Sequence, residues 1–306
     1  MGEPLGITVM LGGPSAERDV SLRSGSAVAR ALRSSGHSVH ELDPRNDSWS
    51  LPLGTEIVFL ALHGTYGEDG TVQRRLETLG MVYTGSNSSS SRTAFDKTLS
   101  KKAFIAAGVP TARFDVIPSI RAPWPAGWKP PVVLKPVRQG SSVGLQFVER
   151  TEDWVAALAE SMRYDTQVLV EEMIRGRECT VAILDDQPLP ILEIRPKQGG
   201  YDYTNKYTPG RTDYLCPAPF DPATSNHIRE TALAAFHAVG GRDYARVDII
   251  VPPEGGNPVV LEVNTLPGMT ESSLFPKAAE AAGISFTDLC ERMIDLAIRR
   301  AQPATL

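Results

Sequence analysis

Residues 245–273 read ARVDIIVPPEGGNPVVLEVNTLPGMTESS, two short apolar runs around a turn rich in proline and glycine. Each run carries polar residues at alternate positions, as a strand with one buried face does. An antiparallel register that pairs Asp248 with Glu262, or one shifted by two residues, brings both carboxylates and the amide of Asn264 together. Such oxygen ligands suit a hard cation such as Mg²⁺. We therefore expect a hairpin that carries a metal site.

Strict alternation also predicts which residues of the hairpin share a face. It places Arg246 beside Asp248, opposite Val247, and it places Val260 beside Glu262. The alternative to a metal site is two half-solvated strands with ordinary acidic residues on the wet face. The turn at Pro267-Gly268 favours the metal interpretation, because it brings bare backbone N–H groups next to the acidic cluster.

Composition is that of an ordinary soluble globular chain: 306 residues, 42% hydrophobic and 22% charged, long enough for two or three domains. The net charge of −5 and the dispersed basic residues give no sign of nucleic-acid or membrane binding. No run approaches the ~18 apolar residues of a membrane span. Cys179, Cys216 and Cys290 lack metal-site spacing, so we expect reduced thiols, two of them buried, and a cytoplasmic location.

The sequence pattern in the first third of the chain predicts a small parallel sheet with flanking helices. Its expected strands are 7–11, 39–42 and 57–62, and its expected helices are 22–35 and 70–80. In such a sheet, ligands bind beyond the carboxyl ends of the strands. Glu17 and His63 follow two strand ends, so both are candidates for holding a small polar substrate. The alternatives are a helix N-terminal charge for Glu17 and a hydrogen-bonded strand-end imidazole for His63.

The middle of the chain offers a phosphate site. Lys135 ends a predicted strand, 132–136, and precedes a hairpin rich in glycine and serine, 138–144, whose backbone N–H groups and hydroxyls suit phosphate oxygens. The alternative is a flexible turn. Neither a Walker A loop nor a G-x-G-x-x-G fingerprint occurs in the chain. The polar run 86–91, SNSSSS, is interpreted as a linker, and Asp96 is expected to cap a helix that ends near Gly108.

The later elements are predicted from their patterns. They are a helix at 151–162, strands at 145–148, 168–172, 179–184 and 189–194, and helices at 222–240 and 286–300. The strand 168–172 ends in two carboxylates, Glu171 and Glu172, that suit ribose hydroxyls. The loop 198–207, rich in glycine and tyrosine, is interpreted as a lid or as an Ω-loop packed by its own tyrosines.

Seven short motifs, in order along the chain, resemble those of the ATP-grasp ligases, and within them the D-alanine–D-alanine ligase family. They are GGPSAERDVS (12–21), LHGTYGEDG (62–70), DKTLSK (96–101), KPVRQGSSVG (135–144), YDYTNKY (201–207), RVD (246–248) and EVNTLPGMTESSL (262–274). The resemblance implies a mixed α/β and α+β fold: a Rossmann-like parallel-sheet domain at 1–91, and two ATP-grasp domains, at 92–178 and 179–306, that clasp ATP. It also implies that the carboxylate of one D-alanine is phosphorylated, and that the amine of a second D-alanine attacks the resulting acyl phosphate.

The resemblance further implies roles for individual residues. Lys97, Lys135, Gly140 and Ser142 would contact ATP phosphates, and Glu171, Glu172, Ile174 and Glu178 would contact adenine and ribose. Asp248, Glu262 and Asn264 would hold two Mg²⁺ ions, for which Mn²⁺ is a substitute, beside a monovalent cation such as K⁺. Glu17, Ser141, Tyr207, Arg246, Gly268 and Ser273 would be catalytic, and His63 and Lys206 would bind substrate. A homodimer that uses D-alanine and ATP, without nucleic acid or membrane, is implied as well.

Three positions depart from the commonest pattern of the family. Glu172 stands where many members carry a lysine, Ser272 replaces a frequent histidine, and Pro14 replaces a frequent threonine. The alternatives are an ATP-grasp ligase for a different carboxylate and amine, a nucleotide-binding homologue without catalysis, and a dinucleotide-dependent oxidoreductase. Tyr207 favours an amine as the second substrate, because the resemblance links its absence to ester-forming relatives.

Overall fold

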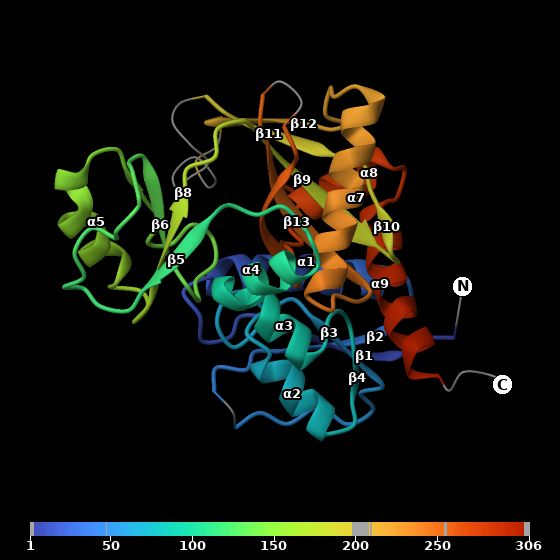
Figure 1. The fold of residues 1–306 in the computed structure, drawn as a ribbon. Helices are drawn as coiled ribbons and strands as arrows, with labels where there is room; N and C mark the ends of the chain where they lie inside the picture. Colours follow the sequence, from blue (N-terminus) through green and yellow to red (C-terminus); the bar gives the residue numbers. More distant parts are fainter. Residues whose placement is uncertain (1–2, 47, 198–207, 209, 254–255, 303–306) are drawn as a thin grey trace.

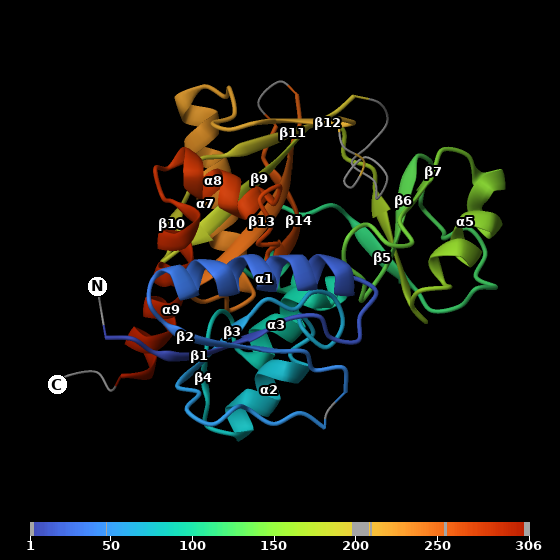
Figure 2. The ribbon, with the colours of Figure 1, turned by 180° about the vertical axis from the view of Figure 1, so that it is seen from behind.

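A computed structural model describes residues 3–46, 48–197, 208, 210–253 and 256–302 of the chain. Three β-sheets organise these residues, each formed by a different part of the sequence (Figure 1). The sheet of β5–β8 stands to one side of the view, away from the other two (Figures 1 and 2). A mixed α/β and α+β architecture is therefore confirmed.

The first sheet is parallel throughout, as the sequence predicts, in the order β2-β1-β3-β4. Its elements are β1 (Gly6–Met10), α1 (Arg18–Ser34), β2 (Ser38–Leu42), β3 (Ile57–Leu60), α2 (Thr71–Thr78) and β4 (Val82–Tyr83). Gly36 follows α1 with a φ of 94°, a conformation that glycine adopts without steric cost. Helix α1 begins four residues earlier than predicted, so Glu17 is its N-cap residue.

The second sheet is antiparallel, in the order β5-β8-β6-β7. Its elements are α4 (Lys97–Ala106), β5 (Phe114–Ile117), β6 (Val132–Pro136), β7 (Gln146–Val148), the 3₁₀ turn η1 (Thr151–Asp153), α5 (Trp154–Ser161) and β8 (Val168–Glu172). Asp96 caps α4 as expected, because its side chain accepts from the N–H groups of Thr98 and Leu99. Alternate residues of β6 and β8, such as Val132 and Val170, pack in a core with α5.

The third sheet is also antiparallel, in the order β12-β11-β9-β13-β14, with β10 paired to β9. Its elements are β9 (Arg177–Leu184), β10 (Gln187–Pro188), β11 (Leu192–Pro196), β12 (Thr212–Leu215), α7 (Pro222–Ala238), β13 (Tyr244–Val251), β14 (Val259–Asn264), α8 (Leu274–Ala281) and α9 (Phe286–Ala301). Strand β11 begins three residues later than the predicted strand 189–194. The apolar stripe of α9, including Leu289 and Met293, is buried in the core beneath the first sheet.

The two faces of the third sheet have different surroundings. Val181, Val247 and Ile249 point to the face that α7 covers and belong to one apolar core with it. The intervening residues Thr180, Arg246 and Asp248 point the other way, away from α7. Helix α8 packs on another part of this face, on β9, and the part around Glu178, Arg246 and Asp248 lines a space. Across that space lies the face of the second sheet that α5 leaves free.

The hairpin has the predicted register, but one predicted face is wrong. Arg246 pairs with Asn264 and Asp248 with Glu262, after which the register shifts and Ile249 pairs with Val260. This β-bulge adds one residue to β14 and reverses its alternation. Val260 is therefore fully buried in the core, whereas Leu261 lies beside Glu262 on the open face.

The prediction of a linker at 86–91 is also wrong. The serines form the first turn of α3 (Ser88–Phe95), whose N-cap is Asn87. The Asn87 side chain accepts from the N–H of Ser90 at 2.8 Å, and Ser90 and Ser91 are buried. A polar N-cap and small side chains that pack closely explain why a run without apolar residues is helical here.

Two further expectations concern cysteines and membranes. Cys179 and Cys290 are buried and Cys216 is half-buried, all three with free thiols, as predicted. Burial raises the pKa of all three thiols, so none is activated. Within the described ranges, the helices are too short or too polar to cross a membrane.

Candidate active site

A cavity of about 650 Å³, the large cavity, lies between the second and third sheets. One wall comes from β6, β7 and β8 and the other from β9, β13 and β14. Its predicted site residues are Lys97, Lys135, Ser142, Glu171, Glu172, Ile174, Glu178, Arg246, Asp248 and Glu262. Apolar side chains such as Val133, Phe147 and Leu261 line the same space, so the cavity suits a ligand with both an apolar ring and charged groups.

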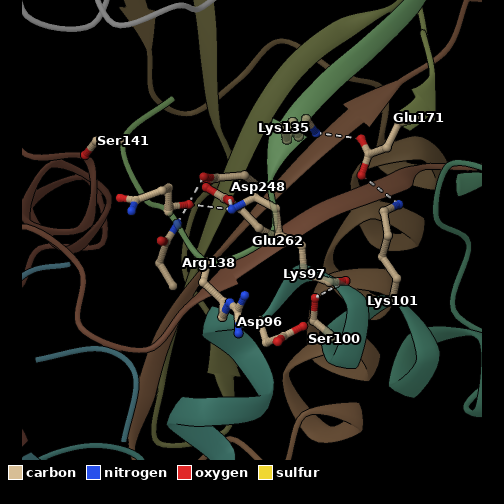
Figure 3. Close-up of polar contacts among 12 residues, drawn as sticks. Asp96, Lys97, Ser100, Lys101, Lys135, Arg138, Ser141, Glu171, Asp248 and Glu262 are labelled. Carbon is tan, nitrogen blue, oxygen red and sulfur yellow. Dashed lines mark hydrogen bonds and ion pairs between the residues drawn. The ribbon is translucent and has the colours of Figure 1, made fainter. Parts of the chain in front are cut away.

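Lys135 and Glu171 form a buried ion pair in one wall of the large cavity. The Lys135 Nζ donates to Glu171 Oε2 at 2.6 Å, and the other oxygen, Oε1, lies 3.1 Å from the Nζ of Lys101 (Figure 3). Burial alone would raise the pKa of Glu171, but the two ammonium groups outweigh burial and hold it below its usual value. Burial likewise opposes the charge of Lys135, but Glu171 reverses the effect and raises its pKa.

Lys97 begins α4 and points toward the opposite wall. Its Nζ donates to the backbone oxygen of Gln139 in the Gly/Ser hairpin at 2.5 Å and lies 3.8 Å from Glu262 Oε2. The first turn of α4 therefore links the hairpin to β14. Three elements from distant parts of the sequence meet around one ammonium group.

Asp248 is the centre of a network on the other wall. Arg246 donates to both of its oxygens, from Nε at 2.9 Å and from Nη2 at 2.8 Å. Thr180 donates to Oδ1 at 2.6 Å, and the amide of Asn264 donates to Oδ2 at 3.2 Å. The carboxylate is thus held in one orientation by side chains from three strands.

The donor set at the hairpin fits Mg²⁺. Asp248 and Glu262 are directly opposed across the two strands, and Asn264 adds an amide oxygen. Among the described residues there is no group of three or more His, Cys, Asp or Glu side chains placed to hold a metal ion. Mg²⁺ ordinarily combines one or two carboxylates with water and the phosphate oxygens of a substrate, so this small donor set suits it.

A second cavity of about 120 Å³, the small cavity, adjoins the hairpin. Its predicted site residues are Glu17, His63, Gly140, Ser141, Arg246, Asn264, Gly268 and Ser273. The Ser141 hydroxyl donates to Glu17 Oε1, which ties the Gly/Ser hairpin to the start of α1. Ser141 and Ser142 have φ values of 52° and 58°, a left-handed conformation that strains residues other than glycine, and such strain is concentrated at functional sites.

His63 is 5% exposed and both its ring nitrogens have partners in the protein. Nδ1 lies 3.2 Å from the backbone oxygen of Leu266, and Nε2 lies 3.1 Å from the hydroxyl of Ser24. That hydroxyl also accepts from the N–H of Met269. His63 thus both lines the small cavity and supports the turn 266–269.

Glu68 is a cavity residue that the sequence reasoning did not select, although it lies in the quoted motif 62–70. Its Oε1 is 3.6 Å from His63 Nδ1, and burial raises the pKa of its carboxyl. A Cβ added to Gly140 would lie 3.0 Å from Glu17 Oε2 and 3.9 Å from Glu68 Oε2, so both carboxylates face this glycine. Two carboxylates facing one small space suit a cationic ligand such as an ammonium group. Thr180 and Lys101 were also missed, because only tertiary contacts identify them.

Gly268 and Ser273 lie together at one end of the small cavity. Ser273 is the N-cap of α8, and its hydroxyl contacts the N–H of Thr270 at 3.0 Å. The N-terminal end of a helix favours a carboxylate ligand. A Cβ on Gly268 would lie 2.7 Å from Ser273 Oγ, so the cavity has no room for a side chain there.

Gly268→Ala is therefore expected to reduce binding at this end of the cavity and to leave the fold intact. The added methyl group meets only the end of a small side chain, which can rotate, but rotation withdraws the Ser273 hydroxyl from the cavity. We expect kcat/KM for the substrate bound there to fall roughly tenfold. Steady-state kinetics measure the effect, and thermal denaturation of the variant checks that the fold is intact.

The two cavities meet at Arg246, which lines both. The described site residues fall into one continuous site, with the metal-ligand candidates at the junction. Lys206 and Tyr207 lie outside the described residues.

The chain matches two family models, "D-ala D-ala ligase N-terminus" over residues 40–86 and "D-ala D-ala ligase C-terminus" over residues 123–295. It is 46% identical to the D-alanine–D-alanine ligase of Methylacidiphilum infernorum, covering 97% of both chains, and 46% identical to that of Syntrophotalea carbinolica, covering 94% of both. Crystal structures of D-alanine–D-alanine ligase from Bacillus anthracis are also similar. One superposes with a TM-score of 0.86 at 34% identity, covering 97% of this chain and 98% of that one. A structure of the same enzyme with ATP superposes with a TM-score of 0.84 at 33% identity, covering 98% and 99%. The chain belongs to the D-alanine–D-alanine ligase family and is a ligase.

Proposed function

We propose that the chain joins two D-alanine molecules to D-alanyl-D-alanine, with ATP in the large cavity and both amino acids in the small one. The observation that carries this assignment is the junction at Arg246, where a cavity suited to a nucleotide meets one suited to a small zwitterion. Family membership, and the ATP complex of a relative, support ATP as the energy source. The product is a precursor of peptidoglycan.

ATP is proposed to lie with its phosphates toward the Gly/Ser hairpin. Lys97 and Lys135 supply positive charge, and Gly140 and Ser142 supply hairpin donors. Glu171, Glu172, Ile174 and Glu178 line the same cavity, and adenine and ribose are proposed to lie beside them. Glu172 stands where many relatives carry a lysine, so this part of the cavity carries extra negative charge.

Asp248, Glu262 and Asn264 are proposed to hold two Mg²⁺ ions. The ions would offset phosphate charge that otherwise repels a carboxylate nucleophile. Mn²⁺ is proposed as a substitute, and a monovalent cation such as K⁺ as an activator. Asp248 is already oriented by Arg246, Thr180 and Asn264, which is the arrangement that outer partners give to a metal ligand.

The small cavity is proposed to hold the two amino acids in order. Glu17 pairs with the ammonium of the first D-alanine, and Ser141 and His63 help to position the substrates. Arg246 and the N–H of Gly268 face the oxyanion that develops at the reacting carbonyl. Ser273 and Lys206 face the carboxylate of the second D-alanine, and Tyr207 completes the hydrogen-bonded set with Glu17 and Ser141.

The reaction has two steps. A carboxylate oxygen of the first D-alanine attacks the γ-phosphorus of ATP, and the bond to ADP breaks, which gives an acyl phosphate. The neutral amine of the second D-alanine attacks the acyl carbon, phosphate leaves, and the amine nitrogen loses a proton as the amide forms. Arg246 stabilises negative charge in the second step, when the acyl carbon becomes tetrahedral and its oxygen becomes an oxyanion.

ATP hydrolysis with alanine of each hand tests the assignment. With D-alanine, we expect one phosphate released for each D-alanyl-D-alanine formed, identified by mass spectrometry and chiral chromatography. With L-alanine, we expect no dipeptide. A dipeptide from another amino acid at higher kcat/KM than D-alanine would instead identify a ligase of different specificity.

Tyr207→Phe is expected to slow ligation more than it weakens ATP binding. The proposal places the hydroxyl in the acceptor site, so its removal affects the second step and leaves the nucleotide contacts unchanged. We expect kcat to fall roughly tenfold or more while KM for ATP changes less than about twofold. Equal effects on both constants would show that the residue does not act at the acceptor site.

Three further proposals follow from the family resemblance. The chain is a homodimer, and it acts in the cytoplasm. Its domains are 1–91, 92–178 and 179–306. The first two contain the first and second sheets, and the third contains the third sheet except for the start of β9 at Arg177. Sedimentation at micromolar concentration tests the first proposal directly.

A further inference from the structure

Lys101 is a buried lysine that the mechanism above does not use. It lies in α4 and is 1% exposed, and it does not itself line the large cavity. Figure 3 shows its ammonium on one side of the Glu171 carboxylate and that of Lys135 on the other. Glu171 is 2% exposed, so all three charges lie in a region that water screens weakly.

The contacts of Lys101 indicate that it is charged. Its Nζ donates to Thr111 Oγ1 at 2.8 Å and to the backbone oxygen of Ala112 at 3.0 Å. Thr111 uses its own hydrogen on the backbone oxygen of Val260, so it accepts from the lysine. A third oxygen, Glu171 Oε1, lies 3.1 Å from the Lys101 Nζ. These two atoms form an ion pair, but they are not aligned as a hydrogen bond. A neutral amine has two N–H groups, so its lone pair would face a carboxylate oxygen.

The cluster therefore carries two positive charges and one negative charge. If Lys101 were absent, Glu171 would pair with Lys135 alone, at 2.6 Å, and the pair would be neutral. Other carboxylates, those of Glu172, Glu178, Asp248 and Glu262, line the same cavity. In these acidic surroundings, the loss of one cation changes the potential at the phosphates strongly.

We propose that Lys101 is a positioning residue for ATP: it shares Glu171 with Lys135 and so leaves a net positive charge on the cavity wall for the triphosphate. The inference rests on the proposed function, because it takes ATP as the occupant of the large cavity. Lys101 acts through Glu171 and touches neither the nucleotide nor the reacting atoms.

Lys101→Met tests the proposal, because methionine keeps most of the side-chain volume and removes the charge. We expect the Kd for a non-hydrolysable ATP analogue with Mg²⁺, measured by calorimetry, to rise roughly tenfold. The Kd for adenosine should stay within about twofold, because adenosine has no phosphate. Lys101→Arg should retain the affinity of the unmodified chain for the analogue. Lys102→Met, at the exposed neighbouring position, is the matched control and should have no effect.

A double variant separates charge from packing. Lys101→Met leaves the cluster neutral, and adding Glu171→Gln restores one net positive charge, that of Lys135, while keeping an acceptor oxygen at position 171. Because Glu171 is also proposed to lie beside adenine and ribose, the readout is the ratio of the Kd for the ATP analogue to the Kd for adenosine. We expect this ratio to be smaller for the double variant than for Lys101→Met alone. An equal or larger ratio in the double variant, or equal losses of analogue and adenosine binding by Lys101→Met, would overturn the proposal.

Different results would contradict the proposed function and this inference. If the unmodified chain bound neither ATP analogue nor ATP, the large cavity would not be a nucleotide site. If it bound them and Lys101→Met bound them equally well, only the role of Lys101 would be contradicted.

Discussion

Glu262→Gln should abolish most turnover while the protein remains folded. The change keeps the size of the side chain and removes one of the two carboxylates proposed to hold Mg²⁺ between the phosphates. We expect kcat to fall by about a hundredfold or more, with part of the loss recovered at high Mg²⁺. The Glu262 side chain is 32% exposed and its nearest cation, Lys97, lies 3.8 Å away, so solvent screens the lost interaction. The thermal midpoint should therefore change by less than about 3 °C.

Glu280→Gln is the matched control for this experiment. Glu280 is exposed on α8, away from both cavities, so the same chemical change should leave kcat and Mg²⁺ dependence unaltered. Near-normal ligation by Glu262→Gln at an ordinary Mg²⁺ concentration would contradict the assignment of a metal site to the hairpin.

Arg246→Lys should also reduce turnover strongly, although it conserves charge. Arginine donates to both oxygens of Asp248 at once, and a lysine ammonium cannot reproduce that planar contact while also facing the reacting carbonyl. We expect kcat to fall roughly 10² to 10³-fold, the range for loss of an oxyanion donor. The part-buried hydrogen bonds to a charged group contribute about 1.5–3 kcal/mol to stability, so the free energy of unfolding should fall measurably as well.

Chemical denaturation separates the two effects of Arg246→Lys. Assays at temperatures well below the midpoint of the variant report catalysis by folded protein only. Arg163→Lys, at an exposed position just after the end of α5, is the control for replacing arginine with lysine. A kcat within threefold of the unmodified enzyme would show that Arg246 is structural.

The hairpin shows how far sequence reasoning reaches. Because polar residues recur with the period of a strand, two registers are expected, one that pairs Asp248 with Glu262 and one shifted by two residues, and the structure has the first. The bulge after it was not predicted, since Leu261 and the two residues before it, Val259 and Val260, carry no glycine or proline signal. Local pattern specified the register, and packing against the core specified which of Val260 and Leu261 is buried.

Other site features depend on contacts that the sequence does not display. Lys101 reads as one more basic residue of α4, and only β8 beside it reveals Glu171 as its partner. Ser24 reads as a helix residue, although it supports both His63 and the turn after β14. The family motifs indicated which residues gather at the site, and the tertiary structure shows how Glu68, Thr180 and Lys101 hold them.

Transfer of an oxygen atom tests the central claim, that a carboxylate in the small cavity takes a phosphoryl group from ATP in the large one. D-alanine labelled with ¹⁸O in both carboxylate oxygens is incubated with ATP and Mg²⁺, and the released phosphate is analysed by mass spectrometry. The account predicts one ¹⁸O atom in each phosphate, because the acyl phosphate passes its bridging oxygen to phosphate when the amine attacks. Phosphate without label, formed together with D-alanyl-D-alanine, would contradict it.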